Sequence, residues 1–76
     1  MPRLTPMKRR KFESLLRMIG CTLKRQTGDH LVYSRQDLKR PVIITTDSEV
    51  PIFIIRNNLR TLGISIEEYL NLIEQL

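Results

Sequence analysis

The sequence predicts an α+β domain in which three antiparallel strands pack against helices. Two changes of hydrophobic period carry this prediction: apolar residues recur at helical spacing before Gly20, alternate with polar residues from there to Thr46, and then return to helical spacing. A sheet must bury one face, and the helices on either side of it in the sequence are available to cover that face. Because 76 residues suffice for one thin core, we expect residues 1–76 to form a single domain.

The first helix is expected over residues 6–19. Thr5 and Pro6 have the chemistry of an N-cap and a first helical position, and Gly20 supplies a stop signal. Apolar residues between them follow the spacing of one helical face, namely Phe12, Leu15, Leu16 and Ile19. We therefore expect this helix to turn one apolar stripe toward the core.

Three strands are expected next. Residues 21–26 form the first, and the turn Thr27-Gly28-Asp29 joins it to the second, His30–Ser34, because Gly and Asp tolerate the positive φ of tight hairpins. A polar connection then leads to the third, Val42–Thr45, a β-branched segment opened by Pro41.

Two helices are expected to complete the chain. Residues 52–55 have strand composition, but the apolar spacing around them favours a helix that is capped by Asp47 or Ser48 and ended by Gly63. The last helix begins at a capping box, Ser65-Ile66-Glu67-Glu68, which is the strongest local signal in the sequence.

Charge is distributed unevenly along the chain. Residues 1–40 carry eleven Lys and Arg against three Asp and Glu, and residues 41–76 carry two against five, so a half of charge +8 precedes a half of −3. The basic half indicates a polyanionic partner, with nucleic acid the first candidate and an anionic membrane or an acidic protein behind it. Four cations crowd the start of the first helix, where positive charge is unfavourable, so either binding or a solvated charged face explains Lys8, Arg9, Arg10 and Lys11.

Several classes of site are excluded by the residues present. One Cys and one His without metal-ligand spacing predict no metal site, and three isolated glycines form no phosphate-cradling loop, so no cofactor is expected. The longest apolar run, residues 52–55, is too short to span a membrane, and no export signal is expected at the basic start. With the lone Cys21 thiol, these features favour a cytoplasmic protein.

His30 is the one side chain suited to proton transfer near neutral pH. It follows the Gly-Asp turn, and we expect Lys24 and Arg25 of the preceding strand to lie within cross-hairpin reach. An imidazole can act as general base or acid, and cations can stabilise charge that develops on a phosphate. Spacing alone leaves a structural histidine open as the alternative.

Five segments of the sequence resemble the HicA family of toxin components over residues 7–70: residues 8–16, Gly20-Cys21, residues 28–33, residues 48–51 and residues 62–65. The resemblance implies a fold similar to the double-stranded-RNA-binding domain, in the order α-β-β-β-α with an extra C-terminal helix. It also implies metal-independent RNA cleavage and neutralisation by a HicB antitoxin. In the Gly-X-His turn of the family, His30 takes the catalytic role and Gly28 is the small residue.

Two positions depart from the family pattern. Asp29 stands where the family more often has Ser or Asn, and Thr45-Thr46-Asp47 replaces a frequent Pro-Arg-His after the third strand. The second departure removes a phosphate-binding or proton-transfer group. The single histidine would then alternate as base and acid, or share the work with a Lys or Arg that stabilises charge.

Three functions remain from different classes. The first is an RNA-cleaving toxin, or mRNA interferase, in which His30 deprotonates a ribose 2′-OH while cations hold the RNA backbone, namely Lys24, Arg25, Lys8, Arg9, Arg10 and Lys11. The second is a non-catalytic RNA-binding module of the same fold, favoured by the missing Arg and His. The third, DNA binding through a helix-turn-helix over residues 59–69, is disfavoured because the recognition helix carries three Glu and no Lys or Arg.

The acidic second half offers a surface for a protein partner. Phe53, Ile54 and Tyr69 are the candidates for contact with a HicB-like antitoxin or a second copy of the chain, unless they complete the core. An antitoxin would inhibit most simply by covering His30 and the basic face.

Overall fold

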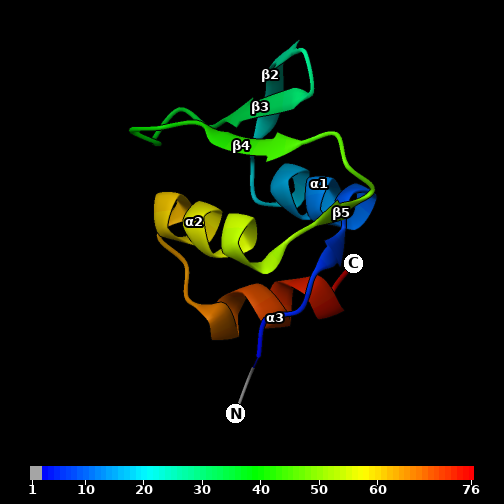
Figure 1. Ribbon diagram of the computed structural model, residues 1–76. Coiled ribbons are helices and arrows are strands. Elements are labelled where there is room, and N and C mark those ends of the chain that lie inside the picture. The colour runs from blue at the N-terminus through cyan, green and yellow to red at the C-terminus, as the bar shows by residue number, and fades with distance from the viewer. Residues whose placement is uncertain (1–2) are drawn as a thin grey trace.

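The computed structural model describes residues 3–76, and its elements follow the predicted α-β-β-β-α order with an extra C-terminal helix (Figure 1). The main sheet contains β2 (Thr22–Thr27), β3 (His30–Ser34) and β4 (Val42–Thr45), paired antiparallel in that order. The helices are α1 (Arg9–Met18), α2 (Ile52–Leu62) and α3 (Ile66–Glu74). The short strands β1 (Met7–Lys8) and β5 (Glu49–Val50) form a separate antiparallel pair. This architecture confirms the predicted fold class, a double-stranded-RNA-binding-domain-like α+β fold.

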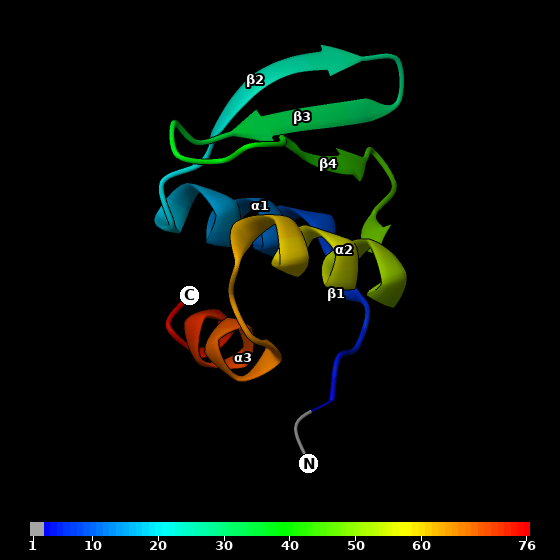
Figure 2. The same cartoon turned by 90° about the vertical axis from the view of Figure 1, so that its left-hand side faces the viewer.

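Three layers build the molecule: the sheet, then α1 and α2, then α3 on the far side of those helices (Figure 1). Within the sheet, β4 lies nearest to the helices and β2 lies farthest from them (Figure 2). All six residues of β2 are exposed. Strand β2 therefore projects from the core, because α1 and α2 are too far from it to cover it (Figure 2).

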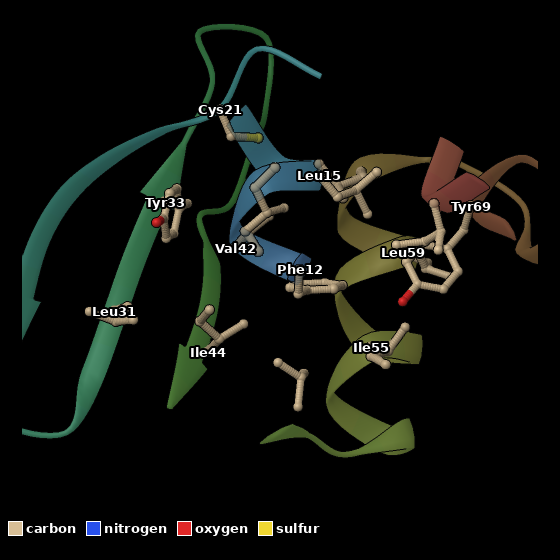
Figure 3. Packing of buried hydrophobic residues seen from close by; sticks show 14 of the residues in the cluster. Phe12, Leu15, Cys21, Leu31, Tyr33, Val42, Ile44, Ile55, Leu59 and Tyr69 are labelled. Atoms are coloured by element: carbon tan, nitrogen blue, oxygen red, sulfur yellow. The ribbon is translucent and has the colours of Figure 1, made fainter. Parts of the chain in front are cut away.

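The core lies between the sheet and the helices (Figure 3). Alternate residues of β3 and β4 point inward, and register places Leu31 opposite Ile44 and Tyr33 opposite Val42. Helix α1 contributes Phe12, Leu15 and Leu16, while α2 contributes Ile55, Leu59 and Leu62. Each fully buried apolar side chain of this size contributes about 1.5–3 kcal/mol, so this shared interface holds the sheet on the helices.

The first helix starts later than predicted. It begins at Arg9, not at position 6, because Met7 and Lys8 extend to pair with β5, which the sequence analysis did not predict. The Arg9 N–H donates to the Ser48 carbonyl at 2.9 Å. Lys8 occupies the N-cap without a side-chain capping bond, so the predicted Thr5 cap is wrong.

Helix α2 is also capped differently from the prediction. Pro51 occupies its N-cap, because Glu49 and Val50, which follow the predicted caps Asp47 and Ser48, are extended in β5. The predicted end is confirmed, since Gly63 takes the left-handed conformation with φ of +72°.

Helix α3 begins at the predicted capping box. The Ser65 hydroxyl accepts from the Glu68 N–H at 3.0 Å, and the Glu68 carboxylate accepts from the Ser65 N–H at 3.3 Å. Tyr69 lies 6.2 Å from Phe12 between ring centroids and is 1% exposed, so it belongs to the core and is not available as an interface residue. In residues 3–76 no helix has the length and apolar character needed to cross a membrane.

Candidate functional site

His30 is the first residue of β3 and lies in the middle strand of the sheet. Register pairs it with Thr27 on one side and Thr45 on the other. The two-residue turn before it contains Gly28 with φ of +58° and Asp29 with negative φ, the pattern of a type II′ hairpin turn. The His30 side chain is 55% exposed, so the imidazole is open to solvent and to a substrate.

Asp29 is the nearest polar neighbour of the imidazole. Its Oδ1 lies 2.9 Å from His30 Nδ1, and this side chain is itself 77% exposed. A carboxylate at this distance favours the tautomer with the proton on Nδ1, which leaves the Nε2 lone pair free to accept a proton. From the sequence, Asp29 was predicted as a turn residue and as a departure from the family pattern, but not as a partner of the imidazole, although its position directly before His30 indicates that contact.

Arg25 shares a face of the sheet with His30, because cross-strand partners project to the same side. Arg25 is opposite Val32, which is two residues beyond His30 on the same strand. Such diagonal neighbours lie about 7–8 Å apart, within reach of a long side chain. Lys24 falls at the register shift between Leu23 and Arg25, so it has no cross-strand partner.

A basic hollow of about 430 Å³ lies at the start of α1 and is lined by Lys8, Arg9, Arg10, Thr46 and Ser48. In the sequence, Thr46 follows Thr45, the register partner of His30, so this hollow lies just beyond the end of β4. The side chains of Lys8, Arg10 and Lys11 are exposed.

Arg9 differs from the other three cations of the predicted cluster. Its Nε donates to Glu13 at 3.1 Å, and a second N–H donates to the carbonyl of Thr46. Glu13 also accepts from the hydroxyl of Tyr33, and burial together with this hydrogen bond raises the pKa of Tyr33 to about 12. These contacts connect α1 to the sheet and to the loop after β4, so the Arg9 side chain stabilises the fold.

A smaller hollow of about 280 Å³ lies on the other side of His30, between β4 and α2. Its lining comprises His30, Pro41, Ile43, Ile44, Thr45, Ile54, Asn57 and Asn58. Asn58 is buried, and its Nδ2 donates to the Ile43 carbonyl at 3.2 Å, which fixes α2 against the free edge of β4. Asn57 is exposed.

A third hollow of about 770 Å³ adjoins the second and was not predicted. It is lined by Asp37, Leu38, Lys39, Arg40, Asn57, Arg60, Thr61 and Leu62. Its cations come from the connection before β4 and from α2, segments that only the folded chain brings together. Among residues 3–76, no group of three His, Cys, Asp or Glu side chains is arranged to hold a metal ion. Metal-independent RNA cleavage stays a prediction.

Comparison with known proteins identifies the family. Residues 9–64 match the family model described as the HicA toxin of bacterial toxin-antitoxin systems. The matched segment contains α1, the main sheet, α2 and the turn that carries His30, and it leaves α3 outside. Curated proteins and solved structures gave no significant match. Because the match covers well over half of the chain, the protein belongs to the HicA family of toxins from bacterial toxin-antitoxin systems.

Proposed function

We propose that this protein is an endoribonuclease toxin, an mRNA interferase, which cleaves flexible single-stranded RNA without a metal and is neutralised by a HicB-type antitoxin. The proposal takes residues 1–76 as a single domain that acts in the cytoplasm. Family membership supports the toxin class. The observation that carries the chemistry is the solvent-open His30 imidazole beside Asp29. A basic hollow lined by Thr46, one residue past the strand partner of His30, supports it.

His30 performs both proton transfers in this proposal. Its Nε2 removes the proton of a ribose 2′-OH, and the 2′-oxygen attacks the adjacent phosphorus. The bond from phosphorus to the 5′-oxygen breaks, and that oxygen takes the proton back from the imidazolium. The products are a 2′,3′-cyclic phosphate and a 5′-OH, so atoms and charge balance with one histidine.

Exposed cations near His30 hold the RNA backbone. Arg25 lies on the same sheet face, and Lys24 lies beside it on β2. Lys8 at the N-cap of α1, with Arg10 and Lys11 in its first turn, adds three exposed cations. Gly28 contributes through the turn that aims the imidazole. We assign Arg9 to the stability of the fold because its guanidinium is already hydrogen-bonded. In-line attack needs a flexible strand, and binding through these charges should weaken with salt.

The antitoxin is expected to cover His30 and the basic hollows. Among the interface residues predicted from the sequence, Phe53 is 64% exposed and Ile54 is half-buried, so these two stay candidates for that contact.

The test is incubation of a labelled unstructured RNA with purified protein in EDTA, comparing the parent with His30→Ala. We expect His30→Ala to lower the cleavage rate at least about 100-fold, the low end for general acid-base catalysis. Gln36→Ala, an exposed residue of the connection before β4, is the control and should cleave like the parent. Equal rates for the parent and His30→Ala would contradict the mechanism.

A non-catalytic RNA-binding module is the second candidate, and one observation favours it. Asp47 stands where the family frequently has a histidine. Its carboxylate accepts a hydrogen bond at 3.0 Å from the hydroxyl of Thr45, which is the strand partner of His30. An acid at this position would repel a phosphate. Salt-dependent RNA binding by the parent, with no cleavage and no effect on growth when the chain is expressed alone, would favour this function.

A further inference from the structure

The groove between β4 and α2 continues from His30 to a second group of cations. The hollow that contains His30 and the larger hollow beyond it share Asn57. Along α2, the lining runs from Ile54 to Leu62, which at 1.5 Å per residue is about 12 Å. The bond from Asn58 to the Ile43 carbonyl holds the two walls together, so the groove is a fixed feature of the fold.

The far end of the groove is positively charged. Lys39 and Arg40 enter it from the connection before β4, and Arg60 enters from α2. The ion pairs within residues 3–76 involve Arg9, His30 and Arg35. The three groove cations are therefore without an acidic partner in this part of the chain. The single carboxylate in the lining, Asp37, is held by Arg35 through contacts of 2.6 and 3.1 Å. Three cations remain available to an external anion.

The near end of the groove is apolar, and its lining includes Ile43, which is 43% exposed. Phe53 is outside that lining, but it is 64% exposed and lies one helical turn before Asn57, so both side chains project from the same side of α2. Exposed aromatic rings bind unpaired bases by stacking, and cations bind the backbone of the same strand. A regular duplex has no unpaired base to offer such a ring, so the combination favours a single strand.

We propose that the β4–α2 groove binds single-stranded RNA on one side of the cleavage site, with Lys39, Arg40 and Arg60 on backbone phosphates and Phe53 stacked on a base. His30 then lies between two basic surfaces, this groove and the hollow at the start of α1. The inference rests on the proposed function, because it extends the RNA site of that same histidine.

The test measures binding apart from cleavage. A fluorescent unstructured RNA is titrated onto protein that carries His30→Ala, at several salt concentrations, with Arg60→Gln or Arg3→Gln added. Arg3 is an exposed cation before β1 that lines none of the hollows, so its variant removes the same charge outside the groove. We expect Arg60→Gln to weaken binding about three- to tenfold and to lower the salt slope by about one. Arg3→Gln should change binding less than about twofold, and neither variant should lower the thermal melting temperature.

Phe53→Ala in the same background should weaken binding about fivefold or more, the low end for loss of one stacked base. A duplex of the same sequence should compete poorly with the single strand. Equal weakening by Arg60→Gln and Arg3→Gln would overturn the inference, and so would equal competition by the duplex. Unchanged RNA binding with lost neutralisation by the antitoxin would also overturn it, by assigning the groove to that protein. None of these outcomes depends on cleavage by His30, so failure of the catalytic proposal remains separately visible.

Discussion

Asp29 and His30 form a contact of 2.9 Å between Oδ1 and Nδ1, directly at the turn that joins β2 to β3. Both side chains are more than half exposed, so their interaction is screened by water and contributes little to stability. Its consequence is orientation, since a carboxylate at Nδ1 leaves Nε2 facing outward as the proton acceptor. Asp29 is therefore a positioning residue in the proposed reaction.

Asp29→Asn should slow RNA cleavage by up to about fivefold, the range of an exposed charged contact. The same variant removes a negative charge beside the substrate, so RNA should bind equally well or more tightly. Single-turnover rates and binding titrations separate the two effects, and ¹⁵N spectra of the imidazole should report a changed balance of tautomers. Slower cleavage explained entirely by weaker RNA binding would contradict the positioning role.

Arg9 and Arg10 are adjacent but should behave differently. Arg9→Gln removes hydrogen bonds to Glu13 and to the Thr46 carbonyl, and we expect a loss of about 1 kcal/mol in the free energy of unfolding. Arg10→Gln, at an exposed position, should leave that free energy within about 0.5 kcal/mol and lower the salt slope of RNA binding by about one. Urea denaturation and RNA titration of both variants provide the measurement. Equal stability of the two variants would show that Arg9 has no special structural role.

Gly28→Ala should destabilise the hairpin. At φ of +58° the added Cβ meets no atom within 4 Å, so the cost arises from the backbone and is about 1–2 kcal/mol. Because the turn aims His30, cleavage should fall as well. Gly28→Asn is the comparison, since Asn tolerates positive φ better and should recover part of both losses. Thermal melts and cleavage rates that match the parent for Gly28→Ala would contradict the prediction.

Alkaline pH should unfold the protein through two buried tyrosines. Burial raises the pKa of Tyr69 to about 12, and burial with the Glu13 hydrogen bond does the same for Tyr33. Because both values lie above the ordinary 10, the unfolded chain ionises first. The stability is therefore complete below pH 10 and is lost as pH rises toward 12, by about 2–3 kcal/mol for each group.

The two tyrosines should differ at neutral pH. The Tyr69 hydroxyl is buried without a hydrogen-bond partner in residues 3–76, so Tyr69→Phe should be neutral or stabilising and should reduce the alkaline loss. Tyr33→Phe breaks the bond to Glu13 and should cost about 1 kcal/mol at pH 7. Urea unfolding at pH 8 and pH 11 tests both statements. Equal alkaline loss in Tyr69→Phe and the parent would contradict the assignment to Tyr69.

Local patterns were sufficient to predict most elements. The bounds of β3 and β4 agree with the prediction because alternation and β-branched residues mark them, and the capping box marks α3. The β1–β5 pair was missed because two-residue strands have no period of their own and arise from contacts between distant segments. That pairing also moved the start of α1 and the cap of α2.

The site divides in the same way. The turn before His30 was predicted correctly from Gly28 and Asp29, whereas the catalytic role of His30 came from the family resemblance and stays a prediction. Only one contact of Arg9 could be predicted from the sequence. Glu13 lies four residues further along the same helix, whereas the Thr46 carbonyl is distant in sequence and is brought to Arg9 by the fold. Lys39, Arg40 and Arg60 come together only when the connection before β4 meets α2, and no spacing in the sequence predicts that.

The exposed strand β2 has a consequence for self-association. It has one neighbour in the sheet of residues 3–76, so its outer backbone groups can pair with a strand of another chain. Lys24 and Arg25 repel an identical strand, and the bulge between Leu23 and Arg25 interrupts a regular ladder. Lys24 and Arg25, which are proposed to hold RNA, should thus also disfavour edge-to-edge aggregation of free copies of the toxin.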